Sequence, residues 1–254
     1  MMEPIDDLKN DIKAYLSKKG SKSKNLRKLL NLNFTDVTSK TYAVGEYDLP
    51  YVTSKITKYP DYIVLYDEKN NYQLTDRTYV SFYNYDVVFD GLLGIYNAIY
   101  YDLNELKNFY RERFEGVKYF ITPDYSLCGD INHIENLYRL FRARIVSVWL
   151  TLELSATVIP SITYSAPKIF PNMLDGMEDC EVVAFSTKGL RNNIECLNLM
   201  GDALKYTVDN LKELRTIIIY TLSKNEEKIN SWFNYAIQHG IELIIPSNRS
   251  KLEV

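Results

Sequence analysis

The sequence Tyr119-Phe120-Ile121-Thr122-Pro123-Asp124-Tyr125-Ser126 is an apolar run that ends in a polar cluster. Two later stretches repeat this pattern: Thr157-Val158-Ile159-Pro160 precedes Thr163-Tyr164-Ser165, and Val182-Val183-Ala184-Phe185 precedes Ser186-Thr187-Lys188-Gly189. Residues 132–153, between the first two runs, have a helical pattern and the length of a crossover connection. The three runs are therefore predicted to be parallel strands of one α/β sheet.

The polar clusters define a candidate site, because ligands of α/β sheets bind at the carboxyl ends of the strands. We expect these clusters to point the same way and to meet in space. The residues expected to bind a ligand there are Asp124, Ser126, Tyr164, Ser186, Thr187 and Lys188. The pattern predicts where the site lies, but it leaves open whether the protein is an enzyme and which ligand or cofactor it takes.

Two of these clusters also have a purely structural interpretation. Asp124 follows a proline at a strand end, so its carboxylate either caps the next turn or faces a ligand as a hydrogen-bond acceptor or base. Residues 186–189 offer two hydroxyls, a cation and a glycine ahead of a predicted helix. They either cap that helix or hold an anion at its start.

Arg144 lies on the apolar stripe of the predicted helix at residues 132–153. A buried guanidinium needs a partner, and a carboxylate or a phosphate suits it best. Asp124 and Asp175 are the candidate carboxylates. Arg144 is therefore expected either to form an ion pair within the fold or to contact the ligand.

Strand and helix patterns alternate through the rest of the chain, which favours a mostly parallel sheet. Seven or eight strands are enough for a TIM-barrel-like or partly open barrel, and an open doubly wound sheet is the alternative. The predicted strands are residues 62–66, 80–89, 117–121, 157–162, 181–185, 216–220 and 241–245, and the predicted helices are residues 103–114, 132–153, 193–212 and 226–238.

The chain divides into a basic helical arm at residues 1–33, an extended linking arm at 34–60 and an α/β domain at 61–254. Residues 9–28 hold eight basic residues and one acid, a charge of +7 in a chain whose total is −3. Such a segment either contacts nucleic acid or is a solvated face. The candidate contacts are Lys18, Lys19, Lys22, Lys24, Arg27 and Lys28.

The composition excludes several kinds of site and a membrane-spanning segment. The cysteines Cys128, Cys180 and Cys196 are widely spaced and form no CxxC pair, and the only histidines are His133 and His239. The sequence therefore predicts reduced thiols and no metal site. It contains no Gly-rich phosphate loop, no apolar run of membrane-spanning length and no basic lead-in to an apolar core. We expect a cytoplasmic protein without a membrane partner.

The central stretch resembles an uncharacterised family of proteins from phages, plasmids and other mobile elements of low-GC bacteria. That family shows in order a PDFS box, an arginine helix, a VIP…W strand, an FDG turn and an STHG box. The corresponding residues are Thr122-Pro123-Asp124-Tyr125-Ser126-Leu127, Arg144, Val158-Ile159-Pro160-Ser161-Ile162-Thr163-Tyr164, Asp175-Gly176 and Ser186-Thr187-Lys188-Gly189. The resemblance covers roughly residues 85–222.

The resemblance implies a mobile-element origin and a shared site that includes Asp175, but no established activity. Three residues depart from the family pattern: Lys188 replaces a histidine, Tyr164 a tryptophan and Thr221 a glycine. Lysine is protonated near neutral pH, so an acid–base role at position 188 is weakened. We expect an accessory protein whose strand-end site binds a small anionic or nucleotide-like ligand. The alternative is a non-enzymatic protein that binds nucleic acid or blocks a host protein; oligomeric state and host target stay open.

Overall fold

The computed structural model describes residues 10, 14, 37, 40–190 and 193–249. The expected basic arm of residues 1–33 lies outside the described residues, apart from the isolated positions Asn10 and Ala14. The candidate nucleic-acid contacts Lys18, Lys19, Lys22, Lys24, Arg27 and Lys28 are therefore not placed.

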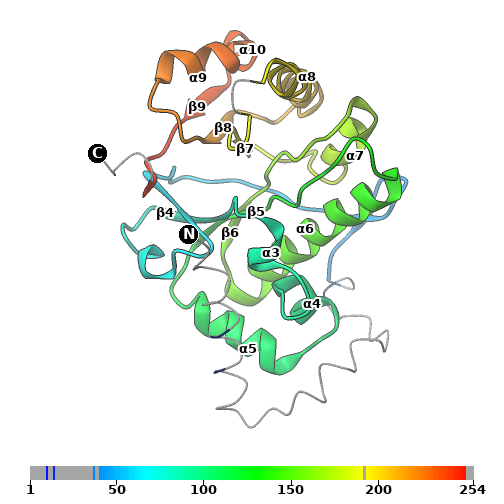
Figure 1. The fold of residues 1–254 in the computed structure, drawn as a ribbon, viewed down its shortest axis with the longest axis vertical. Coiled ribbons are helices and arrows are strands. Elements are labelled where there is room, and N and C mark those ends of the chain that lie inside the picture. Colours follow the sequence, from blue (N-terminus) through cyan, green and yellow to red (C-terminus); the bar gives the residue numbers. More distant parts are fainter. Residues whose placement is uncertain (1–9, 11–13, 15–36, 38–39, 191–192, 250–254) are drawn as a thin grey trace.

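The described chain begins with a short hairpin and then alternates between strands and helices (Figure 1). The first half contains β1 (Ala43–Val44), β2 (Leu49–Pro50), β3 (Tyr62–Leu65), η2 (Lys69–Asn71), β4 (Thr78–Phe82), α3 (Asp86–Phe89), α4 (Ile95–Tyr100), α5 (Asn104–Arg113), β5 (Tyr119–Pro123) and α6 (His133–Leu154). The second half contains β6 (Thr157–Ile159), η3 (Pro167–Ile169), α7 (Phe170–Leu174), β7 (Val182–Ser186), α8 (Ile194–Asn210), β8 (Thr216–Tyr220), α9 (Glu226–Trp232), α10 (Asn234–Gln238) and β9 (Glu242–Ile244).

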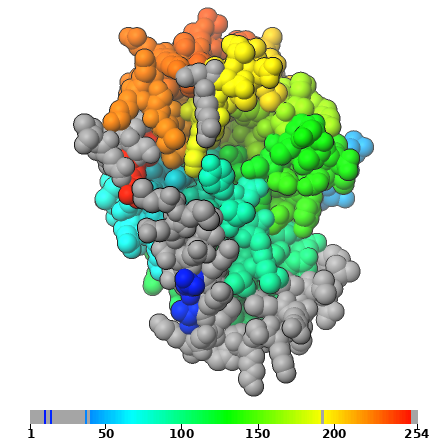
Figure 2. Space-filling view, in the orientation of Figure 1, coloured from blue at the N-terminus to red at the C-terminus, as the bar shows by residue number. Residues whose placement is uncertain are grey.

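Seven strands form two parallel sheets. The alternating pattern correctly predicts parallel pairing, but it predicts one sheet for the runs that form β5, β6 and β7, whereas β7 pairs with β8 in a separate sheet. One sheet has the order β3-β4-β5-β6 and the other β7-β8-β9. Neither sheet closes on itself within the described residues. Figure 1 shows α3 to α6 beside the larger sheet and α8 to α10 beside the smaller one. The space-filling view in the same orientation places the yellow and orange residues of α8 to α10 together at one end (Figure 2).

The two sheets meet at two isolated bridges. Ser161 pairs with Ala184, and Tyr62 pairs with Ser247, both in the parallel sense. The amide of Ala184 donates to the carbonyl of Pro160 at 2.8 Å, and the amide of Ile162 donates to the carbonyl of Ala184 at 2.8 Å. Pro160 has no amide hydrogen, so the chain of β6 leaves β5 after Ile159 and continues beside β7.

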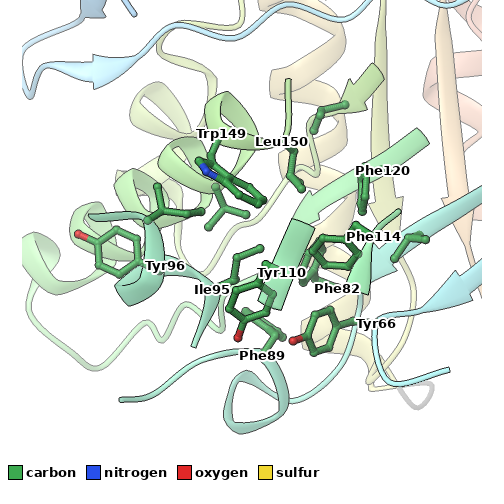
Figure 3. Close-up of a cluster of buried hydrophobic side chains, with 14 of the residues drawn as sticks. Tyr66, Phe82, Phe89, Ile95, Tyr96, Tyr110, Phe114, Phe120, Trp149 and Leu150 are labelled. Atoms are coloured by element: carbon green, nitrogen blue, oxygen red, sulfur yellow. The ribbon is translucent and has the colours of Figure 1, made fainter. Parts of the chain in front are cut away.

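Alternate residues of the strands enter different apolar clusters, because successive side chains point to opposite faces of a sheet. Phe120 and Val158 pack among the helices on the larger sheet, in the cluster drawn in Figure 3. Ile121 and Ile159, their neighbours along the chain, enter a cluster that also holds Ala184 and other residues of the smaller sheet. A third cluster packs β7 and β8 against α7 to α10. The core is therefore divided into a central part between the sheets and two outer parts.

Three predicted elements are wrong in extent. The strand expected at residues 157–162 ends at Ile159 as β6. Residues 80–89 were expected to be one strand, but β4 ends at Phe82 and α3 begins at Asp86. The carboxylate of Asp86 accepts hydrogen bonds from the amide and hydroxyl of Ser126, which ties this turn to the loop after β5. The helix expected at residues 226–238 is divided at Phe233 into α9 and α10, and the ring of Phe233 is buried against Phe185 at 5.7 Å.

The linking arm contains the β1–β2 hairpin, which the sequence pattern did not predict. Past the hairpin, the arm crosses the line where the two sheets meet. The amide of Val52 donates to the carbonyl of Gly176 at 2.8 Å, and the hydroxyl of Ser54 donates to the carbonyl of Val182. The amide of Glu181 in turn donates to the carbonyl of Ser54 at 3.0 Å. These bonds attach the arm to the start of β7.

Candidate functional site

The polar residues after β5 and β6 lie together at the carboxyl ends of these strands. The hydroxyl of Thr163 donates to Oδ1 of Asp124 at 2.7 Å. One layer below, the amide of Ser161 donates to the hydroxyl of Thr122 at 2.8 Å. Parallel pairing brings the two strand ends to the same edge, and these two bonds fix one loop against the other.

The environment of Asp124 at this edge favours the protonated form of its carboxyl group. Burial raises the pKa of Asp124 to about 6, and the nearby charge of Asp86 also favours the protonated form, whereas the Thr163 hydrogen bond and Lys188 oppose the shift. Among the described residues, Thr163 supplies the only hydrogen bond to this carboxylate, and no backbone amide caps it. The turn-capping alternative for Asp124 is therefore not what the structure contains.

Lys188 brings a cation from β7 toward the ends of β3, β4 and β5. Its Nζ donates to the carbonyl of Tyr83 at 2.5 Å and lies 5.8 Å from the centre of the Tyr85 ring. Burial of the ammonium lowers the pKa of Lys188, and the carboxylates of Asp67, Glu68 and Asp124 partly restore it. Lys188 is therefore the point at which residues from four strand ends interact.

Buried tyrosines lie under these charged groups. The ring of Tyr83 stacks on that of Tyr220 with centres 5.0 Å apart, and its hydroxyl lies 3.1 Å from the hydroxyl of Ser161. Burial, and secondarily the charge of Asp124, raises the pKa of Tyr83 far above its ordinary value. Burial and the same carboxylate also raise the pKa of the partly buried Tyr164, which packs on Phe185. Both phenols stay protonated near neutral pH.

Ser126 belongs to a neighbouring ion network. Its amide and hydroxyl both donate to Asp86 at 3.1 Å, and Nη1 of Arg139 donates to the Ser126 carbonyl at 2.7 Å. Arg139 also pairs with Asp86 at 3.3 Å and with Glu135 at 3.2 Å. Ser126 therefore has its hydrogen-bonding capacity largely used within the protein.

The loop after β7 divides between the site and the scaffold. The hydroxyl of Ser186 accepts from the amide of Lys188 at 3.2 Å and so shapes the turn that carries the cation. The hydroxyl of Thr187 is buried and donates to the hydroxyl of Thr221 at 2.8 Å, which joins β7 to β8. The helix cap expected from this loop is supplied instead by Asn193, whose side chain accepts from the amides of Glu195 and Cys196.

Arg144 and Asp175 lie in a different part of the fold. Nη2 of Arg144 donates to the carbonyls of Met173 at 2.9 Å and Asp175 at 3.4 Å, so the partners are backbone groups, not the expected carboxylates. Burial lowers the pKa of Arg144 to about 10, and its charged neighbours are Glu178 and Asp175 with the thiol of Cys180. Asp175 accepts from Asn172 at 3.1 Å under the β1–β2 hairpin.

Sequence reasoning missed Asp67, Glu68, Tyr83, Asp86 and Arg139. Asp67 and Glu68 follow β3 and were assigned to an ordinary turn, and Asp86 was placed inside a predicted strand. Asp67 and Glu68 could have been identified from their position directly after a strand, which is the criterion that identified Asp124. Among the described residues, no group of three or more His, Cys, Asp or Glu side chains is arranged to hold a metal ion.

A family model described as a domain of unknown function, DUF4417, matches residues 41–237. The chain belongs to this family. The DUF4417 region is longer than the stretch of roughly 85–222 expected from the sequence boxes, because it begins at the β1–β2 hairpin. It includes every residue of the candidate site from Asp67 to Lys188. No curated protein and no solved structure matches the chain.

The DUF4417 match excludes the basic residues 9–28 and the last strand, β9. The hairpin, by contrast, belongs to the family domain together with both sheets up to β8. Within the part of the chain that the structure describes, no helix is both long enough and apolar enough to cross a lipid bilayer.

Proposed function

We propose that this DUF4417 protein is a phage or plasmid accessory protein that acts in the bacterial cytoplasm and binds a small nucleotide-like ligand at its strand ends. The sequence boxes that resemble mobile-element proteins support the origin. The convergence of Asp124 and Lys188 at the carboxyl edge of parallel strands supports the site.

A barrel-like enclosure is part of this proposal. The isolated bridges at Ser161–Ala184 and Tyr62–Ser247 link the two sheets at both of their margins. We infer that the seven strands act as one incompletely hydrogen-bonded barrel, with the central apolar cluster inside it. Such an arrangement brings the loops after all seven strands to one end of the molecule.

The environment of Asp124 is the observation that carries the proposal. The carboxylate is partly buried, with a raised pKa, and one of its oxygens receives no hydrogen bond from the described residues. A ligand hydroxyl or amino group can supply the missing donor. With a pKa of about 6, Asp124 is also suited to accept a proton near neutral pH, should the bound molecule react.

Lys188 determines where an anionic group of the ligand fits. The carboxylates of Asp67, Glu68 and Asp124 all act on its ammonium, so phosphate is attracted only on the side of the site that Lys188 occupies. A molecule that carries both a phosphate and a hydroxyl or amino group satisfies Lys188 and Asp124 together. Nucleotides and phosphosugars have this combination.

A thermal-shift screen with nucleotides, phosphosugars, the matching nucleosides and sugars, and inorganic phosphate tests the proposal. A ligand at roughly one hundred times its dissociation constant adds about 2.7 kcal/mol to the stability of the protein. The nucleotide or a phosphosugar should raise the melting temperature more than either fragment does. Asp124→Asn should remove the response, whereas Asp76→Asn, which changes a side chain that is 75% exposed, should keep it.

Two results would overturn the assignment. One is the absence of stabilisation by any nucleotide or phosphosugar. The other is an equal response of the wild type and Asp124→Asn, which would place the ligand elsewhere.

The basic segment of residues 9–28 supports a second candidate function, non-enzymatic binding of nucleic acid. Its eight basic residues stand against one acid, and contact with phosphates needs no sequence motif. Replacing Lys18, Lys19, Lys22 and Lys24 by Gln in the full chain should weaken DNA retention at low salt. Unchanged retention would exclude this function for the segment and leave host-protein binding as the remaining alternative to the ligand site.

A further inference from the structure

A cavity lies under the linking arm, and its lining includes Thr122, one layer below the strand-end site. It has a volume of about 200 Å³ and is bounded by the arm, by α6 and by the outer face of β6. The apolar walls are Tyr42, Val52, Val148, Leu152, Val158 and Pro160. In Figure 1 the arm is the blue segment that runs across the molecule beside α6.

The hydroxyl groups in the wall of the cavity are already used. Ser147 donates to the carbonyl of Ala143 at 2.8 Å, Thr151 to that of Ser147 at 3.0 Å, and Thr41 to that of Tyr51 at 3.3 Å. A hydroxyl that donates its proton to a backbone carbonyl has no proton left for an anionic ligand, although its oxygen still accepts hydrogen bonds. Thr122 differs, since its oxygen accepts from Ser161 and its own proton stays available.

The arm is attached beside the cavity to the segment that follows α7. The hydroxyl of Tyr51 donates to Asp179, and the amide of Val52 donates to Gly176. At Gly176 the fit is so close that an added Cβ would lie 2.6 Å from Val44.

We propose that this cavity binds a compact, neutral aromatic molecule with at most one polar substituent. Apolar cavities of about 150 Å³ stay dry and accept benzene, so 200 Å³ accommodates one ring with a short substituent. Tyr42 and Tyr51 stand edge to face with ring centres 6.5 Å apart and give the ligand an aromatic wall. The proton of Thr122 is placed to meet the one polar atom.

The exposed members of the lining indicate where the ligand enters. Tyr42 is 79% exposed and Leu152 is 48% exposed, whereas Val158 is buried. The mouth therefore lies between the arm and the second half of α6. A larger side chain at Leu152 can block entry without disturbing the core, and a larger one at Ser147 fills the cavity from its inner side.

Saturation-transfer NMR on the full chain, with indole, 4-methylphenol and benzoate as probes, tests the proposal. Lys40 is the one charged residue among the described residues of the lining, and the other walls are apolar or hydroxyl-bearing. Indole and 4-methylphenol should bind, and benzoate should bind at least tenfold more weakly, because its carboxylate must leave water to enter a mainly apolar space. Leu152→Trp should weaken indole binding at least tenfold. Ile134→Trp is the matched control, because Ile134 is 67% exposed on the same helix and lies outside the cavity.

Ser147→Leu is a second blocking variant, chosen so that the conclusion does not depend on one substitution. Its melting temperature shows whether it folds, and binding of indole by a folded Ser147→Leu as tight as that of the wild type would overturn the proposal. So would the absence of saturation transfer from the wild type to indole and 4-methylphenol, equal binding of benzoate, or equal weakening by Ile134→Trp and Leu152→Trp.

Discussion

The hydroxyl of Thr163 lies 2.7 Å from Oδ1 of Asp124 and joins the loop after β6 to the end of β5. This bond stabilises the ionised carboxylate, while the surrounding protein excludes water and favours the neutral acid. The second effect is larger, because the pKa of Asp124 rises from 3.8 to about 6. The protein therefore keeps a destabilised carboxylate at the strand ends, a common property of binding and catalytic groups.

Asp124→Asn is expected to make the protein more stable at neutral pH. Because the folded pKa of Asp124 lies above the unfolded one, the folded protein binds the proton more tightly, and stability falls as pH rises from about 4 through 6. Asparagine cannot ionise, so the variant should gain up to about 3 kcal/mol over the wild type at pH 8 relative to pH 4. Urea denaturation of both proteins at each pH measures this difference.

The titration of all other groups contributes equally to the unfolding free energies of the two proteins, so it cancels when one free energy is subtracted from the other. Parallel stability curves from pH 4 to 8 would show that Asp124 titrates normally. A variant that is less stable at every pH would instead assign Asp124 to the scaffold.

Thr163→Val is expected to raise the pKa of Asp124 further. Valine has nearly the shape of threonine but no hydroxyl, so the carboxylate loses the hydrogen bond that favours its ionised form. Thr163→Ser retains a hydroxyl and should leave the pKa near 6. Titration of the Asp124 carboxyl carbon by NMR measures all three proteins, and an unchanged pKa in Thr163→Val would mean that the bond contributes nothing to the ionised state.

Arg144→Met is expected to destabilise the protein by about 2–4 kcal/mol. The substitution leaves the buried carbonyls of Met173 and Asp175 without the donors that they now have. Arg111→Met is the matched control: Arg111 pairs with Glu153 at a site where both side chains are about one third exposed, and its loss should cost less than about 1 kcal/mol. Urea denaturation separates the two, and a similar small cost for both would contradict the buried role of Arg144.

The thermal shift on adding nucleotide tests whether Arg144 also contacts the ligand. Because its partners lie at α7 and not at the strand ends, folded Arg144→Met should respond to nucleotides as the wild type does. A lost response in a folded protein would assign Arg144 to the binding site, one of the two alternatives that the sequence left open.

The sequence predicts those parts of the fold that depend on local pattern. The run Thr216–Tyr220 consists of β-branched and aromatic residues, all buried in the structure, and its limits as β8 agree with the prediction. The ends of β5 and β7 were predicted to within two residues, and with them the positions of Asp124 and Lys188 after these strands. The bulk of the α/β alternation follows from the same periodicity.

Features that depend on tertiary approach were not predictable. The sequence around Asp86 has the pattern of an apolar strand. In the structure, Asp86 instead accepts a hydrogen bond from Ser126, in a loop 40 residues later in the chain, and local pattern does not reveal this contact. The two-residue strands of the β1–β2 hairpin are too short to give a period. The sequence places Arg144 on the buried face of a helix but does not show which acceptors lie near it. Both carboxylates and backbone carbonyls can accept from a buried guanidinium, so the bonds to backbone carbonyls could not be predicted.

Gly176→Ala is expected to destabilise the protein by about 2–3 kcal/mol, since it combines backbone strain with overpacking. Gly176 has a φ of +75°, and a Cβ there would lie 2.6 Å from Cγ2 of Val44 and 3.1 Å from Cα of Tyr51. Gly189→Ala is the control for strain alone, because Gly189 has a φ of +94° with nothing within 4 Å of the added atom. It should cost about 1 kcal/mol.

Truncating Val44 to alanine in the Gly176→Ala background distinguishes the two contributions. The Cγ2 atom that the new methyl group would contact is then absent. The double variant should therefore recover part of the stability that Gly176→Ala loses. Thermal denaturation of the wild type, the two single variants and the double variant measures the recovery. Strictly additive losses would show that the hairpin moves away from α7 without cost. In that case the arm would not be the fixed wall that the apolar cavity requires.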